Sequence, residues 1–421
     1  MQLNDWLSRL ERLHFKSIDM GLERIQVVAD RLNLRSDTPF IFTVAGTNGK
    51  GSTVSLINEM LSVAGYTTAT YTSPHLIRFN ERVCINRNQC SDKDLVRSFE
   101  AVEAERRDIS LTYFEFTTLA AIWLFKQAKL DAWILEVGLG GRLDAVNVWD
   151  PSISIVTSID IDHQEWLGSD RTQIGMEKIG IGRAGRPLVI GEEELPQPVA
   201  EQAEILGCQV VRQGVQLQWS ESPDDWSLAL TDKTGAQMQL SNLAKPALYL
   251  QNAATAVQAV ALSPFEVQSA QINEALSTVS VTGRRQVICD SPAVMLDVGH
   301  NPHAARALAA CLAQDSERRA HCIIGMLADK DITETVLALL PVVEHWYPAQ
   351  LATERAASAD SLRQSLLEMG ARCGPVQGTP SLICRKLMKM VDKKDLILVF
   401  GSFYTVADVI QYGGLMDSDK D

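Results

Sequence analysis

The chain has 421 residues, of which 46% are hydrophobic and 22% are charged, and its formal net charge is -13. This length predicts two domains, and this balance is typical of a soluble globular protein. The negative charge argues against a general nucleic-acid or anionic-membrane binder, because such proteins rely on clustered Lys and Arg. An anionic ligand must therefore be held by local donors.

Targeting, membrane and disulfide patterns are also missing from the sequence. No run approaches the roughly 20 apolar residues that a membrane span requires, and the amino terminus lacks the basic-then-apolar order of a signal peptide. The eight cysteines are scattered without a C-x-x-C pair, which indicates neither a zinc site nor a disulfide framework. We therefore expect a cytoplasmic protein, with a monomer as the default state.

Two helices are expected before the first strand, because apolar residues recur at helical spacing in 6–13 and again in 22–32. Short apolar runs then alternate with helical stretches, and these runs are FIFTVA, TATYTS, DAWILEVG and SISIVTSI. Such an order predicts a mostly parallel sheet covered by helices. The segment from about 186 to 240 alternates in strand fashion, and we expect it to form a small antiparallel layer.

The alternation of strands and helices restarts in the stretch 281–294 and predicts a second α/β unit. Its strands are expected in MLDVG, HCIIGM, EHWYPA and LILVFGS. The fold class is therefore α/β, with a P-loop-type, mostly parallel domain, a small antiparallel layer, and a smaller Rossmann-like C-terminal domain. We expect the first domain at 1–283, a linker at 284–290 and the second domain at 291–421.

The stretch FTVAGTNGKGST, 42–53, has the features of a phosphate-binding loop. Its glycines lie between a strand and a helix, where backbone N–H groups and a helix amino terminus favour an anion, and Lys50 would add a mobile charge. The stretch departs from the common phosphate-loop spelling, which has a glycine where this chain has Val44 and a Ser or Thr where it has Gly51. The alternative is a plain turn between strand and helix.

Three polar residues follow predicted strands at the same edge of the sheet, where ligands of open α/β sheets bind. Glu136 ends DAWILE, Ser73 follows TATYT, and His163 comes just after SISIVTSI. Carboxylates and hydroxyls suit magnesium. Taken singly, each residue also has an ordinary structural interpretation: a strand-terminal acid facing solvent, a turn serine, and a histidine bonded to a neighbouring carbonyl.

Two further stretches carry candidate polar groups. DVGHNPHA, 297–304, packs an aspartate, two histidines and an asparagine between a strand and a helix, with Pro302 suited to the first helical position. These are more polar groups than a helix cap needs, which favours a functional site. QNAATAVQAV is typical of a plain helix with Asn252 as its N-cap.

Taken together, the motifs resemble those of the folylpolyglutamate synthase and dihydrofolate synthase enzymes, which are relatives of the Mur ligases. The matching motifs are GTNGKGST, TSPHL, EVGLGGRLDAVN, EKIGIGRAG, NAATA, GRRQ, DVGHNPHA and GSFYTVA. They appear in the family's order and cover nearly the whole chain, and GTNGKGS is the family's form of the phosphate loop. The chain departs from the family around GR, with Thr282 before it and Arg285 after it, and in EKIGIGR, where the family often has EKAGI and an aromatic.

The resemblance implies an ATP-dependent amide ligase that forms an acyl phosphate. It would add L-glutamate to dihydropteroate, giving dihydrofolate, and to reduced folates, giving polyglutamates. The KSIDMG segment favours both activities. The alternatives are a monofunctional folylpolyglutamate synthase, a Mur-type ligase, and a P-loop nucleotide-binding regulator that is not a ligase.

The resemblance also implies site residues for ATP, the metal and catalysis. The residues expected around ATP are Thr47, Asn48, Gly49, Lys50, Asn252, Arg284 and Asp297. The expected magnesium ligands, for what are expected to be two Mg²⁺ ions, are Ser73, Glu136 and His163. The expected catalytic residues are Lys50, Lys178 and His300, with Lys178 carried as a carbamate and His300 near the γ-phosphate.

The pteroate site is likewise implied by the resemblance. Its expected residues are Ser17, Ile18, Asp19, Met20, Thr112, Tyr113, Phe114, Glu115, Leu143, Asp144 and Ala145. The chemistry of two of them supports the assignment: an aromatic ring such as Phe114 can stack on a flat heterocycle, and a carboxylate such as Asp19 can pair with its amino and ring nitrogens. The segment TYFEFTTLAA is also typical of a buried helix start, and both interpretations can hold.

Overall fold

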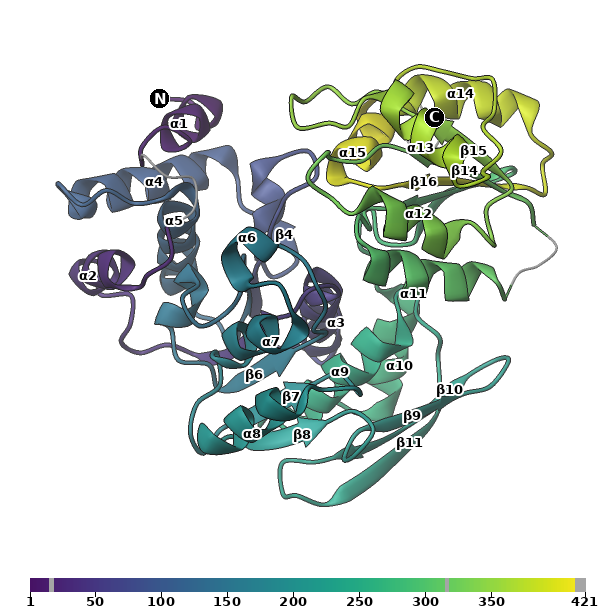
Figure 1. Ribbon diagram of the computed structural model, residues 1–421. Coiled ribbons are helices and arrows are strands. Elements are labelled where there is room, and N and C mark those ends of the chain that lie inside the picture. The colour runs from purple at the N-terminus through teal and green to yellow at the C-terminus, as the bar shows by residue number, and fades with distance from the viewer. Residues whose placement is uncertain (15–18, 315–317, 413–421) are drawn as a thin grey trace. The chain divides into compact units, whose positions relative to one another are not determined.

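The protein is described by a computed structural model that covers residues 1–14, 19–314 and 318–412 (Figure 1). The chain forms two compact units, Met1–Val279 and Ser280–Asp421. The N-terminal unit contains an eight-stranded sheet and a three-stranded sheet, and the C-terminal unit contains a five-stranded sheet. The expectation of an α/β fold is therefore confirmed for both units.

The large sheet has the strand order β4-β3-β2-β5-β1-β6-β7-β8. Its strands are β1 (Phe40–Ala45), β2 (Thr68–Tyr71), β3 (Val83–Ile85), β4 (Asn88–Gln89), β5 (Ala132–Glu136), β6 (Ile153–Val156), β7 (Pro187–Ile190) and β8 (Gln209–Arg212). In this order, all neighbouring pairs between β2 and β8 are parallel. At the other edge of the sheet, β3 pairs antiparallel with β2, and β4 pairs antiparallel with β3. The four runs predicted as strands before residue 160 all lie in this sheet.

Helices cover both faces of the large sheet (Figure 1). Those of the N-terminal unit are α1 (Leu3–Leu10), α2 (Glu23–Arg31), α3 (Lys50–Val63), α4 (Asp92–Arg106), α5 (Tyr113–Gln127), α6 (Gln164–Leu167), α7 (Arg171–Ile179), α8 (Gln197–Ile205), α9 (Leu250–Ala261) and α10 (Ser269–Thr278). Two short 3₁₀ helices are η1 (Phe79–Arg82) and η2 (Ala145–Val148).

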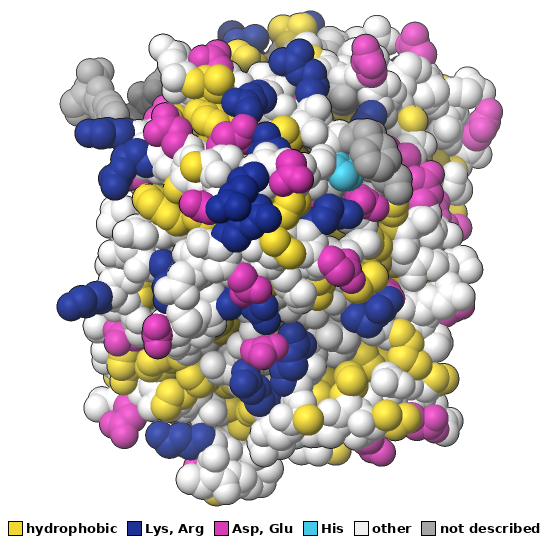
Figure 2. All heavy atoms as spheres, turned by 90° about the vertical axis from the view of Figure 1, so that its left-hand side faces the viewer, with side chains coloured by type: hydrophobic (Ala, Val, Ile, Leu, Met, Phe, Trp, Pro, Cys, Tyr) yellow, Lys and Arg dark blue, Asp and Glu magenta, His cyan; other side chains and the backbone are white. Residues whose placement is uncertain are grey.

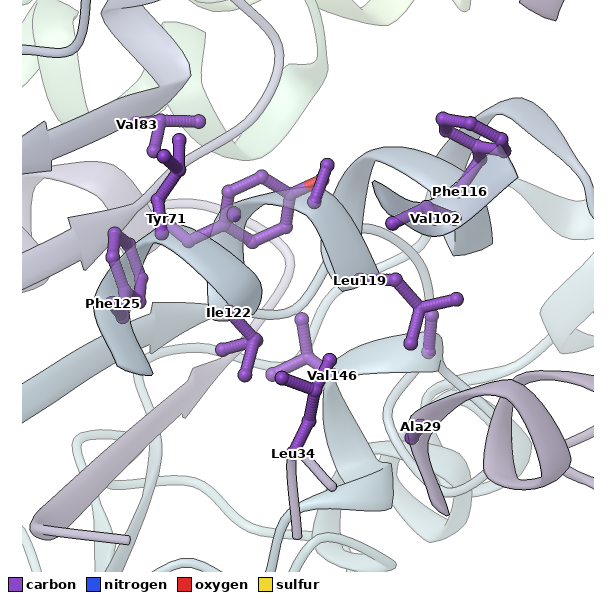
Figure 3. Packing of buried hydrophobic residues seen from close by; sticks show 14 of the residues in the cluster. Ala29, Leu34, Tyr71, Val83, Val102, Phe116, Leu119, Ile122, Phe125 and Val146 are labelled. Atoms are coloured by element: carbon purple, nitrogen blue, oxygen red, sulfur yellow. The ribbon is translucent and has the colours of Figure 1, made fainter. Parts of the chain in front are cut away.

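Alternation along the strands divides the core into two layers, because successive side chains point to opposite faces of a sheet. Tyr71 and Trp133 belong to a buried cluster that also contains apolar side chains of α5. Figure 3 shows two members of this cluster, Tyr71 from β2 and Ile122 from α5. Ile134, which follows Trp133 in β5, and its partner Phe42 in β1 are also fully buried. They face the other side of the sheet, where α3 packs against β1 and β5. Strands buried on both faces explain the continuous apolar runs in the sequence.

One expectation for the N-terminal unit is wrong in part. The antiparallel layer expected for about 186–240 begins only at β9, because β7 and β8 are parallel strands of the large sheet. Helix α8 lies between them and supplies the crossover that parallel neighbours require. The antiparallel sheet has the order β11-β10-β9 and consists of β9 (Gln218–Glu221), β10 (Trp226–Thr231) and β11 (Gln237–Leu243).

The C-terminal unit has the strand order β12-β13-β16-β14-β15. Its elements are β12 (Gln286–Asp290), β13 (Ala293–Asp297), α11 (Pro302–Leu312), β14 (Ala320–Ile324), α12 (Ile332–Leu339), β15 (His345–Pro348), α13 (Ala359–Glu368), α14 (Pro380–Met390), β16 (Leu396–Phe400) and α15 (Phe403–Tyr412). All pairs are parallel except β12 with β13, and β12 lies within the stretch 284–290 that we expected as a linker. Pro302 is the first residue of α11, as predicted.

The surface mixes both signs of charge. Figure 2 shows Lys and Arg side chains interspersed with Asp and Glu on the side of the N-terminal unit that carries α1 and α2. One such contact joins α1 to α4, where Arg9 and Arg106 both pair with Glu103. Among the residues that the structure describes, no helix is long and apolar enough to cross a membrane.

Candidate active site

The loop 46–49 joins the end of β1 to the start of α3, and two of its glycines leave no room for a side chain. A Cβ at Gly46 would lie 1.9 Å from Thr157 Oγ1, and a Cβ at Gly49 would lie 2.3 Å from Asn252 Oδ1. Gly49 also has a left-handed backbone with φ +85°, which glycine adopts without steric cost. The loop backbone therefore lies directly against residue 157 and helix α9.

Hydrogen bonds hold this loop to the residues that follow β6. The Asn48 amide donates to Ser158 Oγ at 3.0 Å, and Thr157 Oγ1 donates to the Asn48 carbonyl at 2.6 Å. The Thr47 hydroxyl donates to the Asp160 carbonyl at 2.9 Å and accepts from the Asp160 amide at 3.0 Å. The loop is therefore shaped before any ligand arrives, which lowers the entropic cost of binding.

Lys50 is the first residue of α3 and folds back over the loop. Its Nζ donates to the carbonyl oxygens of Gly46 at 2.9 Å and Thr47 at 3.2 Å. The ammonium thus lies beside the helix amino terminus, where the macrodipole and free N–H groups also favour an anion. This arrangement suits an anion such as a phosphate group.

Asn252 contacts the loop although it does not cap its helix. Helix α9 begins at Leu250 with Tyr249 in the N-cap position, so the prediction of Asn252 as the cap is wrong. Asn252 lies in the first turn instead, with its amide against Gly49. The helix starts three residues earlier than expected, because Leu250, Gln251 and Asn252 itself have helical backbone.

Glu136 and Ser73 meet at the carboxyl edge of the same sheet. Strand β5 pairs with β1 so that Glu136 lies opposite Val44, and the side chain is only 3% exposed. Glu136 Oε2 accepts from the Ser73 amide at 3.0 Å, and a Cβ at Gly51 would lie 3.5 Å from that oxygen. A carboxylate is an oxygen donor of the kind that divalent cations prefer, so this position next to the loop suits such a cation.

His163 occupies the N-cap position of α6 and is exposed, with a left-handed φ of +52°. Its imidazole, the Ser73 hydroxyl and the Glu136 carboxylate are the donor types that bind Mg²⁺ or Mn²⁺ together with water and phosphate. Within residues 1–14, 19–314 and 318–412, no three His, Cys, Asp or Glu side chains are gathered as a metal cluster. By chemical type, the three expected ligands fit a divalent ion.

Lys178 is buried in the last turn of α7, with 3% of its surface exposed. Burial, followed by the positive charge of Lys50, lowers the pKa of Lys178 to about 7, while Asp162 acts in the opposite direction. A large fraction of the amine is therefore neutral at neutral pH. A neutral amine is nucleophilic, which is what reaction with carbon dioxide requires.

Two of the residues expected around the pteroate, Asp19 and Glu115, both form ion pairs with Arg24. Arg24 donates to Asp19 Oδ2 at 2.6 Å and to Glu115 Oε1 at 3.2 Å. Glu115 is also part of the α5 capping box, since its Oε2 accepts from the Thr112 amide at 2.8 Å. Arg24 was not among the predicted site residues, because its contacts depend on this fold. The expected residues Ser17 and Ile18 lie outside the described residues.

Phe114 and Met20 line the turn that follows β5. The Phe114 ring lies so close to Gly138 that a Cβ there would be 2.6 Å from its Cζ, and the ring is 5.8 Å from that of Tyr71. The Met20 methyl group would be 3.6 Å from a Cβ at Gly140. The glycines of EVGLGG therefore allow these two side chains to reach the edge of the sheet.

Asp144 has a structural role that its motif alone did not indicate. Its carboxylate accepts from the Leu139 amide at 2.9 Å and the Val146 amide at 3.0 Å, and it caps η2. Burial raises the pKa of Asp144 to about 6, against the effect of these hydrogen bonds. Next to it, Leu143 is half-buried and Ala145 is buried.

In the C-terminal unit, Asp297 and His300 follow β13. The buried Asp297 carboxylate accepts from the Arg285 amide at 3.1 Å and the Gly299 amide at 2.7 Å, and burial raises its pKa. The Phe403 ring lies 5.4 Å from the Arg284 guanidinium and 6.4 Å from the His300 ring. Phe403 was not among the predicted site residues, although it lies in the GSFYTVA motif.

A parallel sheet with a phosphate loop, a buried acid at the neighbouring strand end and a second α/β unit together define a nucleotide-dependent ligase of the Mur class. Residues 44–187 match the family model of the Mur ligase middle domain, and residues 283–403 match that of the Mur ligase glutamate ligase domain. The chain belongs, more specifically, to the dihydrofolate synthase/folylpolyglutamate synthase family.

Two relatives show this membership over nearly their full length. The dihydrofolate synthase/folylpolyglutamate synthase of Escherichia coli strain K12 is 45% identical over 412 residues, which cover 97% of this chain and 95% of that protein. The protein of the same name from Haemophilus influenzae is 40% identical over 427 residues, with 96% of each chain covered.

Solved structures of relatives have the same fold. The structure of E. coli FolC in complex with DHPP and ADP has a TM-score of 0.92 at 43% identity and covers 98% of this chain and 97% of that one. A Yersinia pestis bifunctional enzyme complexed with AMPPNP and Mn ion has a TM-score of 0.91 at 44% identity, with 98% of each chain covered. A further structure of a bifunctional enzyme contains Mn, AMPPNP and L-glutamate, with a TM-score of 0.90 at 44% identity and 98% of each chain covered.

Proposed function

We propose that the protein ligates L-glutamate to dihydropteroate and to reduced folates, using ATP and passing through an acyl phosphate. The observation that carries this proposal is the placement of Lys50 and the phosphate loop beside the buried Glu136–Ser73 pair. The names and ligands of the relatives support the choice of substrates.

The chemistry starts from a carboxylate, whose oxygen is too poor a leaving group to be displaced by an amine. Transfer of the γ-phosphoryl group of ATP to this carboxylate turns it into an acyl phosphate, and ADP leaves. Lys50 and the loop amides stabilise negative charge on the phosphoryl group, since positioning and electrostatics supply most of the catalysis in such transfers. The L-glutamate amine then attacks the acyl carbon, and phosphate departs.

Ser73, Glu136 and His163 would hold divalent ions, which we propose to be two Mg²⁺. When bound, Mg²⁺ supplies positive charge that offsets the charge of the phosphates. Lys178 would contribute as a carbamate, because its buried neutral amine can add to carbon dioxide and become an anion. Carbamate formation, with loss of a proton to solvent, would replace a neutral buried amine with an anion that suits a cation.

For the nucleotide, we propose that Thr47, Asn48, Gly49 and Lys50 surround the phosphates and that Asn252 contacts them from α9. Arg284 and Asp297 would bind the rest of the nucleotide from the C-terminal unit, where Phe403 supports Arg284. His300 would assist near the γ-phosphate. Its Nδ1 lies 3.0 Å from the Val298 carbonyl, which orients the ring.

For the pteroate, the described part of the proposed site includes Asp19, Met20 and Phe114. Asp19 would pair with the amino and ring nitrogens of the pterin, and Arg24 holds that carboxylate in place. Phe114 would stack on the ring system. Asp144 would act indirectly, because its hydrogen bond to the Leu139 amide fixes the turn after β5.

The direct test is ATP-dependent phosphate release with L-glutamate and either dihydropteroate or a reduced folate as acceptor. Turnover with both acceptors is expected. Turnover with a reduced folate alone would identify a monofunctional folylpolyglutamate synthase, and turnover only with peptidoglycan precursors would identify a Mur-type ligase. Slow ATP hydrolysis that none of these substrates changes would identify a nucleotide-binding regulator.

We also propose a monomer located in the cytoplasm. Light scattering on the purified protein tests the first proposal, and cell fractionation tests the second. A concentration-independent mass that matches the 46.4 kDa chain is expected.

A further inference from the structure

We propose that Arg82, supported by His75, forms a carboxylate-binding subsite that holds the acceptor substrate. The inference rests on the proposed function and deepens it, because it names a recognition group for the acceptor outside the expected pteroate residues. Four observations carry it: the place of Arg82 in the sheet, its aromatic support, its hydrogen bond to His75, and its lack of a carboxylate partner among the described residues.

Arg82 lies at the edge of the sheet where the reaction is proposed to occur. It ends η1 and precedes β3, which pairs antiparallel with β2. The Thr72 amide donates to the Arg82 carbonyl at 2.9 Å, so Arg82 lies opposite the residue that precedes Ser73. Ser73 in turn contacts Glu136. The backbone of Arg82 is therefore fixed next to the proposed metal site.

The guanidinium is supported on several sides but not neutralised. Its Cζ lies 5.6 Å from the ring centroid of Phe79 and 5.6 Å from that of Tyr113. Its Nε donates to His75 Nδ1 at 2.8 Å. Over residues 1–14, 19–314 and 318–412, Arg82 forms no ion pair with a carboxylate, and its two terminal nitrogens have no hydrogen-bond acceptor. A half-buried cation is thus held in one orientation with its two outer donors available.

Arg24, another half-buried arginine of the N-terminal unit, gives an informative contrast. Arg24 is also half-buried near the start of α5, but it pairs with Asp19 and Glu115. Burying a charge without a partner is unfavourable, and proteins normally compensate for it. Since Arg82 has no such compensation from the described residues, we infer that its counter-ion is supplied by a ligand.

The ligand chemistry follows from the donors. A planar guanidinium binds a carboxylate through two parallel hydrogen bonds. His75 adds a second donor, because its Nδ1 accepts from Arg82 and the ring proton must therefore lie on Nε2. Tyr113 belongs to the segment expected to contact the pteroate, so the acceptor is the substrate whose carboxylate is closest to this subsite. L-glutamate, which also carries carboxylates, is distinguished by the test.

The test compares Arg82→Met with Arg78→Met in the same steady-state assay. Methionine keeps an apolar side chain against the rings of Phe79 and Tyr113 but removes the guanidinium group. The exposed Arg78, which pairs with Asp92 at 3.0 Å, provides the matched control. We expect the KM for dihydropteroate and for a reduced folate to rise about 10- to 100-fold in Arg82→Met, the range of a lost charge-assisted pair. The KM for ATP should stay within about two-fold. Arg82→Lys should restore part of the affinity, because it keeps the charge without the fork.

A rise in KM for L-glutamate alone would overturn the acceptor assignment and move the subsite to the amino acid. Unchanged KM values for all substrates, or an equal loss in Arg78→Met, would overturn the subsite itself. Equilibrium binding of dihydropteroate to wild type and Arg82→Lys gives the same answer without turnover, so it tests the subsite even if the proposed ligase reaction fails or Arg82→Met does not fold.

Discussion

Lys50 donates to two carbonyl oxygens of its own loop, which places its charge at the proposed phosphate site. We expect Lys50→Ala to lower kcat/KM by about 10²- to 10³-fold, the usual effect of removing one donor to a developing negative charge. Thermal unfolding should change little, since the side chain is only half-buried. Lys245→Ala, which removes a surface pair with Glu221, is the control. Near-normal turnover of Lys50→Ala would refute the assignment of the loop.

The buried Lys178 links activity to pH and carbon dioxide. Because burial lowers its pKa to about 7, the amine is increasingly protonated below that pH and cannot form a carbamate. Activity should therefore fall as pH drops through about 7 and should recover on adding bicarbonate. Lys178→Ala should be inactive but partly rescued by short carboxylic acids, which fit the space left by the side chain. Lys178→Met fills that space and should resist rescue. A pH profile that is insensitive to bicarbonate would contradict the carbamate.

The same pKa has a consequence for stability. Between pH 7 and 10.5 the unfolded chain binds a proton at Lys178 that the folded chain does not, so the free energy of unfolding should rise with pH in this window. Lys178→Met lacks this titration and should flatten the slope. Urea unfolding in buffer free of carbon dioxide measures both proteins. Parallel slopes for the two would show that Lys178 is charged in the fold.

At the scale of elements, the strand–loop–helix unit β1–α3 depends on glycine at two positions. Gly49→Ala places a Cβ against Asn252 and forces a left-handed backbone on alanine. Gly65→Ala is a matched control, because Gly65 also has a positive φ of +89° but nothing within 4 Å of its Cβ position. Both variants should lose roughly 1–2 kcal/mol of stability from the backbone. Only Gly49→Ala should lose ATP affinity, which calorimetry measures, and equal affinities would contradict the crowding at Gly49.

The helices and strands were predictable where the local sequence pattern decides the structure. They were less predictable where the structure depends on which strands pair with each other. Apolar runs and helical spacing predicted β1, β2, β5, β6 and β13 to β16, since strands buried on both faces leave a strong signal, whereas β12 fell in the expected linker. The partners of β7 and β8 depend on a crossover that the alternation within each strand does not reveal. The cap predicted at Asn252 lies three residues after the observed N-cap, Tyr249, because helix boundaries are the least reliable part of a prediction from sequence.

The site was predictable in its motifs but not in its supporting residues. The structure brings together Lys50, Asn252, Glu136 and Ser73, which the motifs named. Arg24, Arg82 and Phe403 were missed because their importance lies in what they contact. A single sequence shows an arginine in the same way whether it is paired with Asp19 or left without a carboxylate partner.

For the whole molecule, the proposed nucleotide residues are divided between the two compact units. Lys50 and Asn252 belong to Met1–Val279, and Arg284 and Asp297 belong to Ser280–Asp421. If both sets bind the nucleotide, ATP with Mg²⁺ should raise the unfolding temperature of both units. At an ATP concentration of a hundred times Kd, the free energy of unfolding should rise by about 2.7 kcal/mol. Scanning calorimetry with and without nucleotide measures this effect. A shift confined to one transition would restrict nucleotide binding to one unit.

The hydrogen bonds between the phosphate loop and the end of β6 also constrain how the protein folds. The contact between Asn48 and Ser158 joins residues 110 positions apart in the chain. Contacts of such high sequence separation require the closure of long chain segments and form slowly. The loop cannot reach its final shape until β6 has joined β1, so during refolding the ability to bind nucleotide should return after most helical structure has formed. Recovery of nucleotide binding is thus a natural kinetic probe for completion of the central sheet.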